Sequence, residues 1–183
     1  MKMKESVRLT YKDGSLHING EDMPFVRHEG NGILRDLYVA SGLNYPKYFK
    51  MDPLSRLCVV CTELLIDKGN VRDLMNDRCA ILLSNSASSL DTDITYLRGL
   101  ESTGMGSPAQ FVYTLPNVMI GELCIRHRLF SHTEMYVMPT PDFDILNAQA
   151  ASLISSGVCE TALIGWIDVL GDRMEAELRL VTK

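Results

Sequence analysis

The sequence predicts a layered α/β fold, on three observations. The chain begins and ends with pairs of strand-like runs that are joined by turn residues. Between these pairs, apolar runs typical of buried strands alternate with segments whose apolar residues recur at helical spacing. No internal repeat, low-complexity segment or linker divides the 183 residues, so we expect residues 1–183 to form a single domain.

Composition narrows the class of protein. The chain is 46% apolar and 22% charged, which is typical of globular domains. Its 18 basic and 23 acidic residues offer no basic stripe, which argues against nucleic-acid binding. Five scattered cysteines fit reduced thiols, and no apolar run approaches the roughly 20 residues of a membrane span. We therefore expect a cytoplasmic protein with no membrane span and no bound cofactor or metal.

The first 25 residues predict a β-hairpin, because the runs VRLTY and SLHING flank the turn Lys12-Asp13-Gly14. A short helix is expected after it, over residues 33–41.

A longer amphipathic helix is predicted to start at Asp52-Pro53, with Asp52 as its cap. Its stripe contains a C-x-x-C pair, Cys58 and Cys61, which is either a redox pair, half of a metal site or part of the core. The core interpretation is favoured because both cysteines lie on the apolar stripe and the chain has no second ligand pair.

The run from Cys79 to Ser84 predicts a strand that is buried on both faces. In the polar loop that follows, Asp91 or Thr92 is expected to cap the next helix, an interpretation preferred to a phosphate-binding loop. Residues 108–114 are expected to be extended, and Leu115-Pro116-Asn117 to begin a helix that reaches about residue 129.

The segment Tyr136–Gly157 predicts a strand, a sharp turn through Pro139-Thr140-Pro141 and an apolar helix. Bends of this kind often present a nucleophile, and Thr140 is the residue offered here. Two strand-like runs then follow, joined at Gly171-Asp172, and predict an antiparallel pair.

Three segments resemble the N-terminal half of the β-ketoacyl-ACP synthases, which are condensing enzymes of thiolase fold. They are Met51–Leu57, Ser107–Val137, with its Pro-Asn helix start, and Ala150–Gly157 with the strand after it. The resemblance covers most of the chain from about Lys50 onward. It implies a thiolase-like half-domain: a mixed, five-stranded-type sheet with helices on both faces, preceded by the N-terminal hairpin.

In that family the bend carries a catalytic cysteine, and Thr140 occupies its position in this chain. The family's two active-site histidines come from a C-terminal half that has no counterpart here, and His17, His28, His127 and His132 match neither. We therefore predict no catalytic residue. We expect Thr140 to cap the following helix instead, with its Oγ accepting from the amide of residue 142 or 143, for about 1 kcal/mol of stability.

The family also dimerises through the strand that leads into the bend, and the helix after the bend is apolar around most of its circumference. This implies a partner interface. Its predicted residues are Glu134, Met135, Tyr136, Val137, Met138, Phe143 and Leu146.

The leading functional prediction is a catalytically silent, ketosynthase-like protein of fatty-acid or polyketide biosynthesis, including the aryl-polyene type. It would act by binding a full-length ketosynthase, an acyl carrier protein or a second copy of itself. The first alternative is a stand-alone acyltransferase or ketosynthase with an unidentified nucleophile, for which Cys124 and Cys159 are the thiols that remain outside the apolar stripe and the Cys79 strand. The second alternative is an acyl-binding or CoA-binding module.

Overall fold

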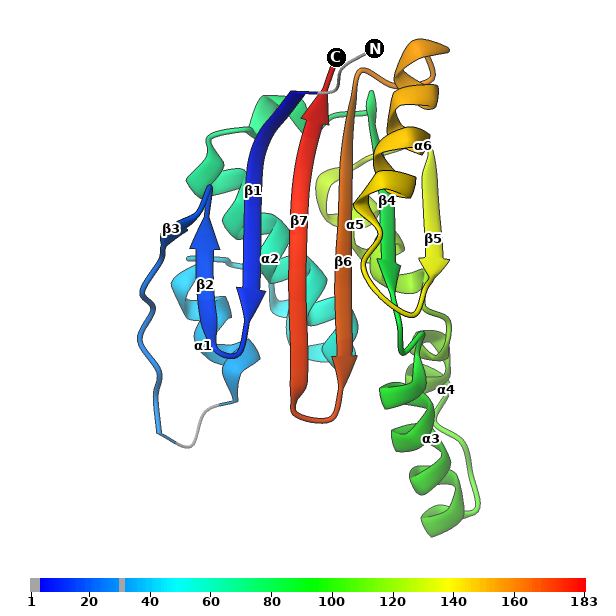
Figure 1. The fold of residues 1–183 in the computed structure, drawn as a ribbon. Helices are drawn as coiled ribbons and strands as arrows, with labels where there is room; N and C mark the ends of the chain where they lie inside the picture. The colour runs from blue at the N-terminus through cyan, green and yellow to red at the C-terminus, as the bar shows by residue number, and fades with distance from the viewer. Residues whose placement is uncertain (1–3, 30–31) are drawn as a thin grey trace.

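The computed structural model describes residues 4–29 and 32–183, and its centre is one mixed sheet of seven strands (Figure 1). The strand order is β3-β2-β1-β7-β6-β4-β5, with β4 parallel to β5 and β6 and the other pairs antiparallel. The strands are β1 (Lys4–Lys12), β2 (Ser15–Ile18), β3 (Glu21–Asp22), β4 (Cys79–Asn85), β5 (Thr133–Val137), β6 (Thr161–Leu170) and β7 (Arg173–Thr182).

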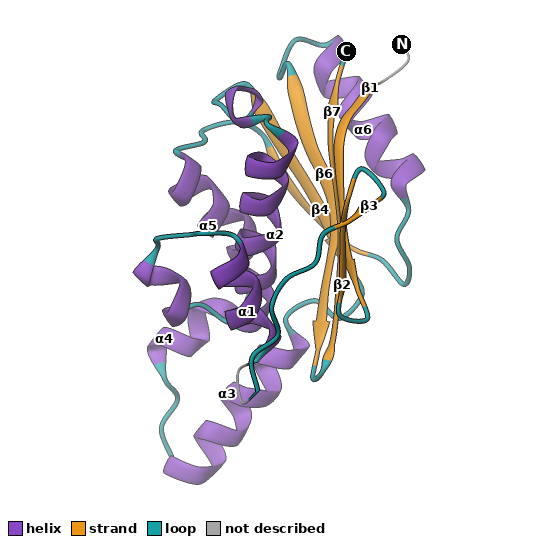
Figure 2. Ribbon diagram, turned by 90° about the vertical axis from the view of Figure 1, so that its left-hand side faces the viewer, coloured by secondary structure: helices purple, strands orange, loops and turns teal. Residues whose placement is uncertain are grey.

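The helices form layers on both faces of the sheet. Figure 2 shows α1, α2 and α5 on one face and α6 on the other, while α3 extends past the end of the sheet. The helices are α1 (Ile33–Ala40), α2 (Pro53–Gly69), α3 (Leu90–Thr103), α4 (Pro108–Phe111), α5 (Val118–His127) and α6 (Phe143–Ser155). Within the described ranges, every helix is too short or too polar to cross a membrane.

The two predicted hairpins are confirmed, and both belong to the same sheet. β1 pairs with β2 around Asp13-Gly14, and β6 pairs with β7 around Gly171, whose φ of 60° favours glycine. Because β1 also pairs with β7, the N-terminal hairpin continues the sheet rather than standing apart from it. The expected mixed α/β sheet with helices on both faces is therefore confirmed, with seven strands.

The main core lies between the sheet and α2, which α1 and α5 flank. Asp52 caps α2 as predicted, by accepting from the Ser55 amide at 3.1 Å. Cys58 and Cys61 are both 0% exposed inside this core, which confirms the structural interpretation of the C-x-x-C pair.

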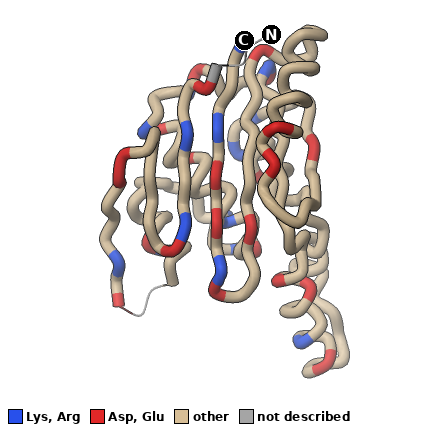
Figure 3. The backbone as a smooth tube through the Cα atoms, viewed as in Figure 1, with Lys and Arg blue, Asp and Glu red and all other residues tan. Residues whose placement is uncertain are grey.

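A smaller core lies under α6, whose Leu146, Ala150 and Ile154 pack on β4 and β6. Beyond α6, charged residues recur along β1 and β7, as Figure 3 shows, and Arg179 lies on the face of α6, with its guanidinium 3.7 Å from the Phe143 ring centroid. There Arg179 pairs with Glu177 at 2.5 Å. Ala176, Leu178 and Leu180, which alternate with these two residues along β7, belong to the main core. One half of this face is therefore apolar and covered, and the other half is polar.

The segment between β4 and α5 differs from its prediction. Residues 108–114 form α4 and a 3-10 turn instead of extended chain, because Ser107 caps α4 by accepting from the Gln110 amide at 3.3 Å and Pro108 fits its first turn. Neither Asp91 nor Thr92 caps α3. Asp91 accepts from the Gly171 amide at 2.8 Å, and Thr92 donates to Asp52 at 3.0 Å.

Gly165 tests how tightly the sheet is packed. A Cβ at this position would lie 2.9 Å from the backbone oxygen of Glu177 and would clash with the Leu178 side chain. We expect Gly165→Ala to lower the free energy of unfolding by about 1–3 kcal/mol, measured by chemical denaturation. Gly121→Ala in α5 meets nothing within 4 Å and should raise it by about 0.5–1 kcal/mol. Equal effects at both positions would contradict the packing argument.

Candidate functional site

The bend between β5 and α6 holds Thr140, but Thr140 does not cap α6. The helix begins at Phe143, and Asp142 caps it by accepting from the amides of Asp144 and Ile145, each at 3.1 Å. The prediction of a threonine cap is wrong because the aspartate is as good a cap and also places its carboxylate at the positive end of the helix dipole. Thr140 lies two residues earlier and is exposed.

Among residues 4–29 and 32–183 the Thr140 hydroxyl has no hydrogen-bond partner, so no general base is hydrogen-bonded to it. Three of the four histidines contact carboxylates instead. His28 Nδ1 lies 3.0 Å from Asp36, His127 Nε2 lies 3.4 Å from Glu63, and His132 Nε2 lies 2.5 Å from Glu134. A threonine hydroxyl without a base is a poor nucleophile. Within the same ranges, no group of three or more His, Cys, Asp or Glu residues could hold a metal ion.

Of the two cysteines considered as alternative nucleophiles, Cys159 is buried and Cys124 is half-buried. Burial raises the pKa of the Cys124 and Cys159 thiols, and Cys159 is only 2% exposed. Burial also raises the pKa of Cys79 to about 11. The thiolate is the reactive form of cysteine, so these environments disfavour nucleophilic catalysis at all three positions.

The strand that leads into the bend is a free sheet edge. β5 pairs with β4 on one side only and ends the strand order, so within residues 4–29 and 32–183 the backbone groups on its outer side have no partner strand. Its side chains are half-buried or exposed, and Val137 is 58% exposed. Unpaired edges of this kind are templates for pairing with another chain.

The predicted interface residues divide into three groups. Glu134, Met135, Tyr136, Val137 and Met138 lie on β5 or directly after it. Phe143 lies at the start of α6, where the Arg179 guanidinium is 3.7 Å from its ring centroid. Leu146 is 0% exposed against the sheet, so its assignment to the interface is wrong: it belongs to the inner face of α6.

The outer face of α6 exposes less apolar surface than its sequence implied. Among its large apolar side chains, only Ile145 is exposed, because small and polar residues occupy the rest of that face. The free edge of β5 therefore contributes more to the candidate interface than α6 does.

The one carboxylate of β5, on Glu134, has hydrogen-bond partners within the chain. Glu134 lies next to the His132 ring and also accepts from the hydroxyl of Tyr136. On the other face of β5, a groove of about 400 Å³ lies between the strand and α5. The groove is lined by Asn117, Ile120, Gly121, Cys124, Thr133, Glu134 and Met135.

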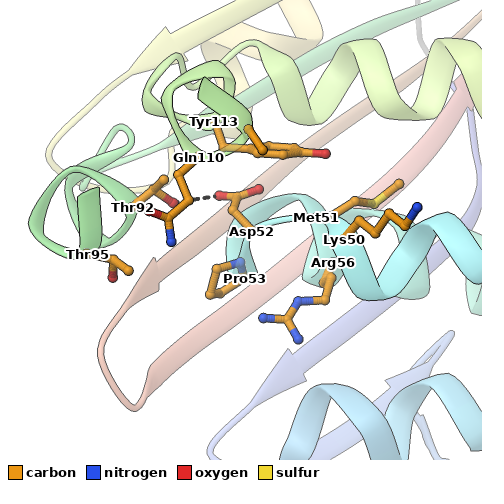
Figure 4. A pocket seen from close by; sticks show the side chains of 10 residues that line it. Lys50, Met51, Asp52, Pro53, Arg56, Thr92, Thr95, Gln110 and Tyr113 are labelled. Atoms are coloured by element: carbon orange, nitrogen blue, oxygen red, sulfur yellow. Dashed lines mark hydrogen bonds between the residues drawn. The ribbon is translucent and has the colours of Figure 1, made fainter. Parts of the chain in front are cut away.

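A second cavity, of about 300 Å³, lies where α2 begins and α3 leaves the body of the protein. Figure 4 shows Asp52 between α2 and Thr92, and the cationic groups of Lys50 and Arg56 pointing in different directions. Burial raises the pKa of the Asp52 carboxyl, while hydrogen bonds from Ser55 and Thr92 oppose that shift. The side chains here tie α3 to α2 and do not converge on a common ligand.

Comparisons with known proteins show the fold. No protein-family model matches the chain, and neither does any curated protein. Solved structures with the thiolase-like fold of ketosynthases and chain length factors do match. The protein has this mixed α/β fold. The sequence identities to these structures are 14–20%, and at that level similarity establishes the fold alone.

Three of the similar structures are complexes from this class. The complex of the ketosynthase ApeO with its chain length factor ApeC from Xenorhabdus doucetiae matches with a TM-score of 0.66 and 14% identity, over 100% of this chain and 79% of that chain. The ishigamide ketosynthase/chain length factor matches with a TM-score of 0.64 and 20% identity, over 85% and 48%. A type II polyketide synthase acyl carrier protein in complex with its hexaketide-bound ketosynthase (AntDE:AntF) matches with a TM-score of 0.61 and 19% identity, over 77% and 50%. This chain therefore spans about half the length of two of these chains.

The raised pKa of Asp52 gives a testable pH dependence. Between the ordinary aspartate pKa of about 4 and the raised value in the folded state, the unfolded chain is ionised while the folded chain still holds the proton. The unfolded state thus binds fewer protons, and this contribution to stability falls as the pH rises through that window. We expect Asp52→Asn, which keeps a good cap, to gain stability relative to the unsubstituted protein as the pH rises.

Denaturation at several pH values measures this effect. Asp52→Ala loses the cap and should be less stable than Asp52→Asn by about 1 kcal/mol at each pH. Asp142→Asn makes the same change at the other aspartate cap and serves as the control. If both asparagine variants show the same pH dependence, burial in the cavity is not responsible.

Proposed function

We propose that this protein is a catalytically silent, ketosynthase-like subunit that binds a full-length ketosynthase in fatty-acid or polyketide biosynthesis, including the aryl-polyene type. The observation that carries the proposal is the free edge of β5, which leads into a bend without a nucleophile. The pathway and the partner belong to the proposal.

Catalytic silence is supported by the chemistry around the bend. The Thr140 hydroxyl has no hydrogen-bond partner within the described ranges, and burial raises the pKa of the Cys124 and Cys159 thiols. A condensing reaction needs an activated nucleophile and groups that move protons, and this half-domain offers neither at the bend. These facts weigh against the stand-alone enzyme.

Partner binding is supported by the contrast between the two edges of the sheet. β3, at one edge, has two residues, Glu21 and Asp22, and both are exposed acids, which discourage strand pairing. β5, at the other edge, has five residues, and the chain continues from it through Met138. Its one carboxylate, on Glu134, is already hydrogen-bonded. β5 is therefore the edge better suited to pairing with a strand from another chain.

The named neighbours favour a ketosynthase as that other chain. Their descriptions are of ketosynthases in complex with a chain length factor or an acyl carrier protein. A contact with an acyl carrier protein is compatible with this proposal and remains a prediction, as does the acyl-binding or CoA-binding alternative. A homodimer through β5 is the competing assembly.

Val137→Arg tests the edge. Val137 is 58% exposed, so the substitution should leave the fold intact. When the tagged protein is purified from its native cell, we expect a full-length ketosynthase in equal amount. The arginine, desolvated in the interface, should lower that recovery roughly tenfold or more.

Val26→Arg is the control, because Val26 is 69% exposed and lies in the segment between β3 and α1, away from β5. It should leave the recovery unchanged. Purification of the unsubstituted protein without a ketosynthase, by quantitative mass spectrometry, would refute the proposed function.

The Thr140→Cys variant tests whether the protein is catalytically silent. The variant gains a thiol at the bend but still lacks the histidines that the condensation needs, so we expect no condensation of radiolabelled malonyl substrate by the isolated chain. A full-length ketosynthase in the same assay provides the positive control. Turnover by the variant or by the unsubstituted chain would show that the site is active.

A further inference from the structure

An exposed apolar arm leaves the body of the protein between β4 and α5. The arm comprises residues 90–115, which form α3, α4 and the turn after them, and it extends beyond the end of the sheet (Figure 1). Of the 14 residues of α3, only Thr92 is buried. Seven large apolar side chains of the arm are exposed: Leu90, Leu97, Leu100, Met105, Phe111, Val112 and Leu115.

The exposed side chains do not belong to a flexible loop, because hydrogen bonds fix the base of the arm. Thr92 donates to the half-buried Asp52, and the Asp91 carboxylate accepts from the amide of Gly171 in the β6–β7 turn. Ser89 donates to the Thr114 carbonyl at 2.7 Å, which joins the two ends of the arm.

Contacts within the arm hold α3 against α4. The rings of Tyr96 and Phe111 lie 5.7 Å apart, and Tyr96 passes so close to Gly106 that a side chain there would clash. The apolar side chains are therefore presented on a pre-formed support. Extended apolar surface of this kind on a folded protein marks an interaction site.

The position of the arm connects it with the free edge of β5. β4 and β5 are parallel and end together, with Asn85 paired to Val137. The arm begins five residues after Asn85, so it starts at the same end of the sheet at which β5 finishes. A chain that pairs with β5 is therefore brought to the base of the arm.

β5 alone is too small to form a stable interface with a partner. Stable protein interfaces bury about 800 Å² on each partner, from roughly 20–30 residues. β5 has five residues, and only one large apolar side chain of α6 is exposed beside it. The arm has 26 residues and seven exposed apolar side chains, so it could supply the interface residues that β5 lacks.

We propose that the arm is the second half of one continuous interface, and that its apolar surface packs on the same ketosynthase chain that pairs with β5. This inference rests on the proposed function and deepens it, because it assigns most of the apolar contact to residues 90–115. A second copy of this chain is the alternative occupant that the experiment distinguishes.

Site-specific photocrosslinking in the native cell tests the inference. The crosslinking residue p-benzoylphenylalanine replaces Phe111 on the arm, Val137 on the edge, or Val26 as the control, in three separate proteins. All three side chains are more than half exposed, so folding should be preserved. We expect the proteins substituted at Phe111 and at Val137 to crosslink to one full-length ketosynthase, identified by mass spectrometry, and the Val26 control to give no such product.

Each other outcome is decisive. A ketosynthase crosslinked from Val137 but not from Phe111 would overturn the role of the arm and leave the proposed function standing. Crosslinks from both positions to a second copy of this chain would overturn the ketosynthase as partner in both proposals. No ketosynthase crosslink from either position would overturn both proposals as well.

Affinity provides an independent readout with the co-purified ketosynthase. The double variant Met105→Ser/Phe111→Ser should bind it about 30-fold or more weakly, as expected for two large apolar contacts of an interface. Val39→Ser in α1, at a side chain that is 58% exposed, is the matched control and should bind normally. Unchanged affinity in the double variant would contradict the inference.

Discussion

β4 is buried along its whole length, and this constraint arranges the elements around it. Its seven residues lie between β5 and β6 in the sheet, with α6 on one face and the main core on the other. A strand of this kind must be covered by apolar groups on both faces, which is why the chain has helices on both faces of one sheet. In the same strand order β5 is the last strand, so the free edge lies directly beside the buried β4.

The function proposed here follows from what lies at the end of these two parallel strands. After β4 the chain forms an apolar arm, and after β5 it forms a bend that carries the exposed Thr140. The hydrogen bonds at this end of the sheet stabilise structure: Asp142 caps α6, and Thr92 and Asp91 fix the base of the arm.

Local signals predicted the elements well, and non-local ones were missed. The cap at Asp52, the core position of Cys58 and both hairpins could be predicted because they depend on residues close in sequence. The pairing of Asp91 with the Gly171 amide could not, because it joins segments 80 residues apart. Leu146 was assigned to the interface because an apolar helix does not reveal by sequence which face meets the sheet. The thiolase-like fold followed from the resemblance, and the free edge of β5 became definite only with the strand order.

The pairing of β1 with β7 has a consequence for how the protein is made. In this sheet Lys4 is paired with Thr182, so β1 has only β2 beside it until β7 has left the ribosome. Contacts this distant in sequence are slow to form. Until then, the nascent N-terminal hairpin has an unsatisfied edge of its own, and a chaperone that shields this edge during synthesis should increase the yield of native protein.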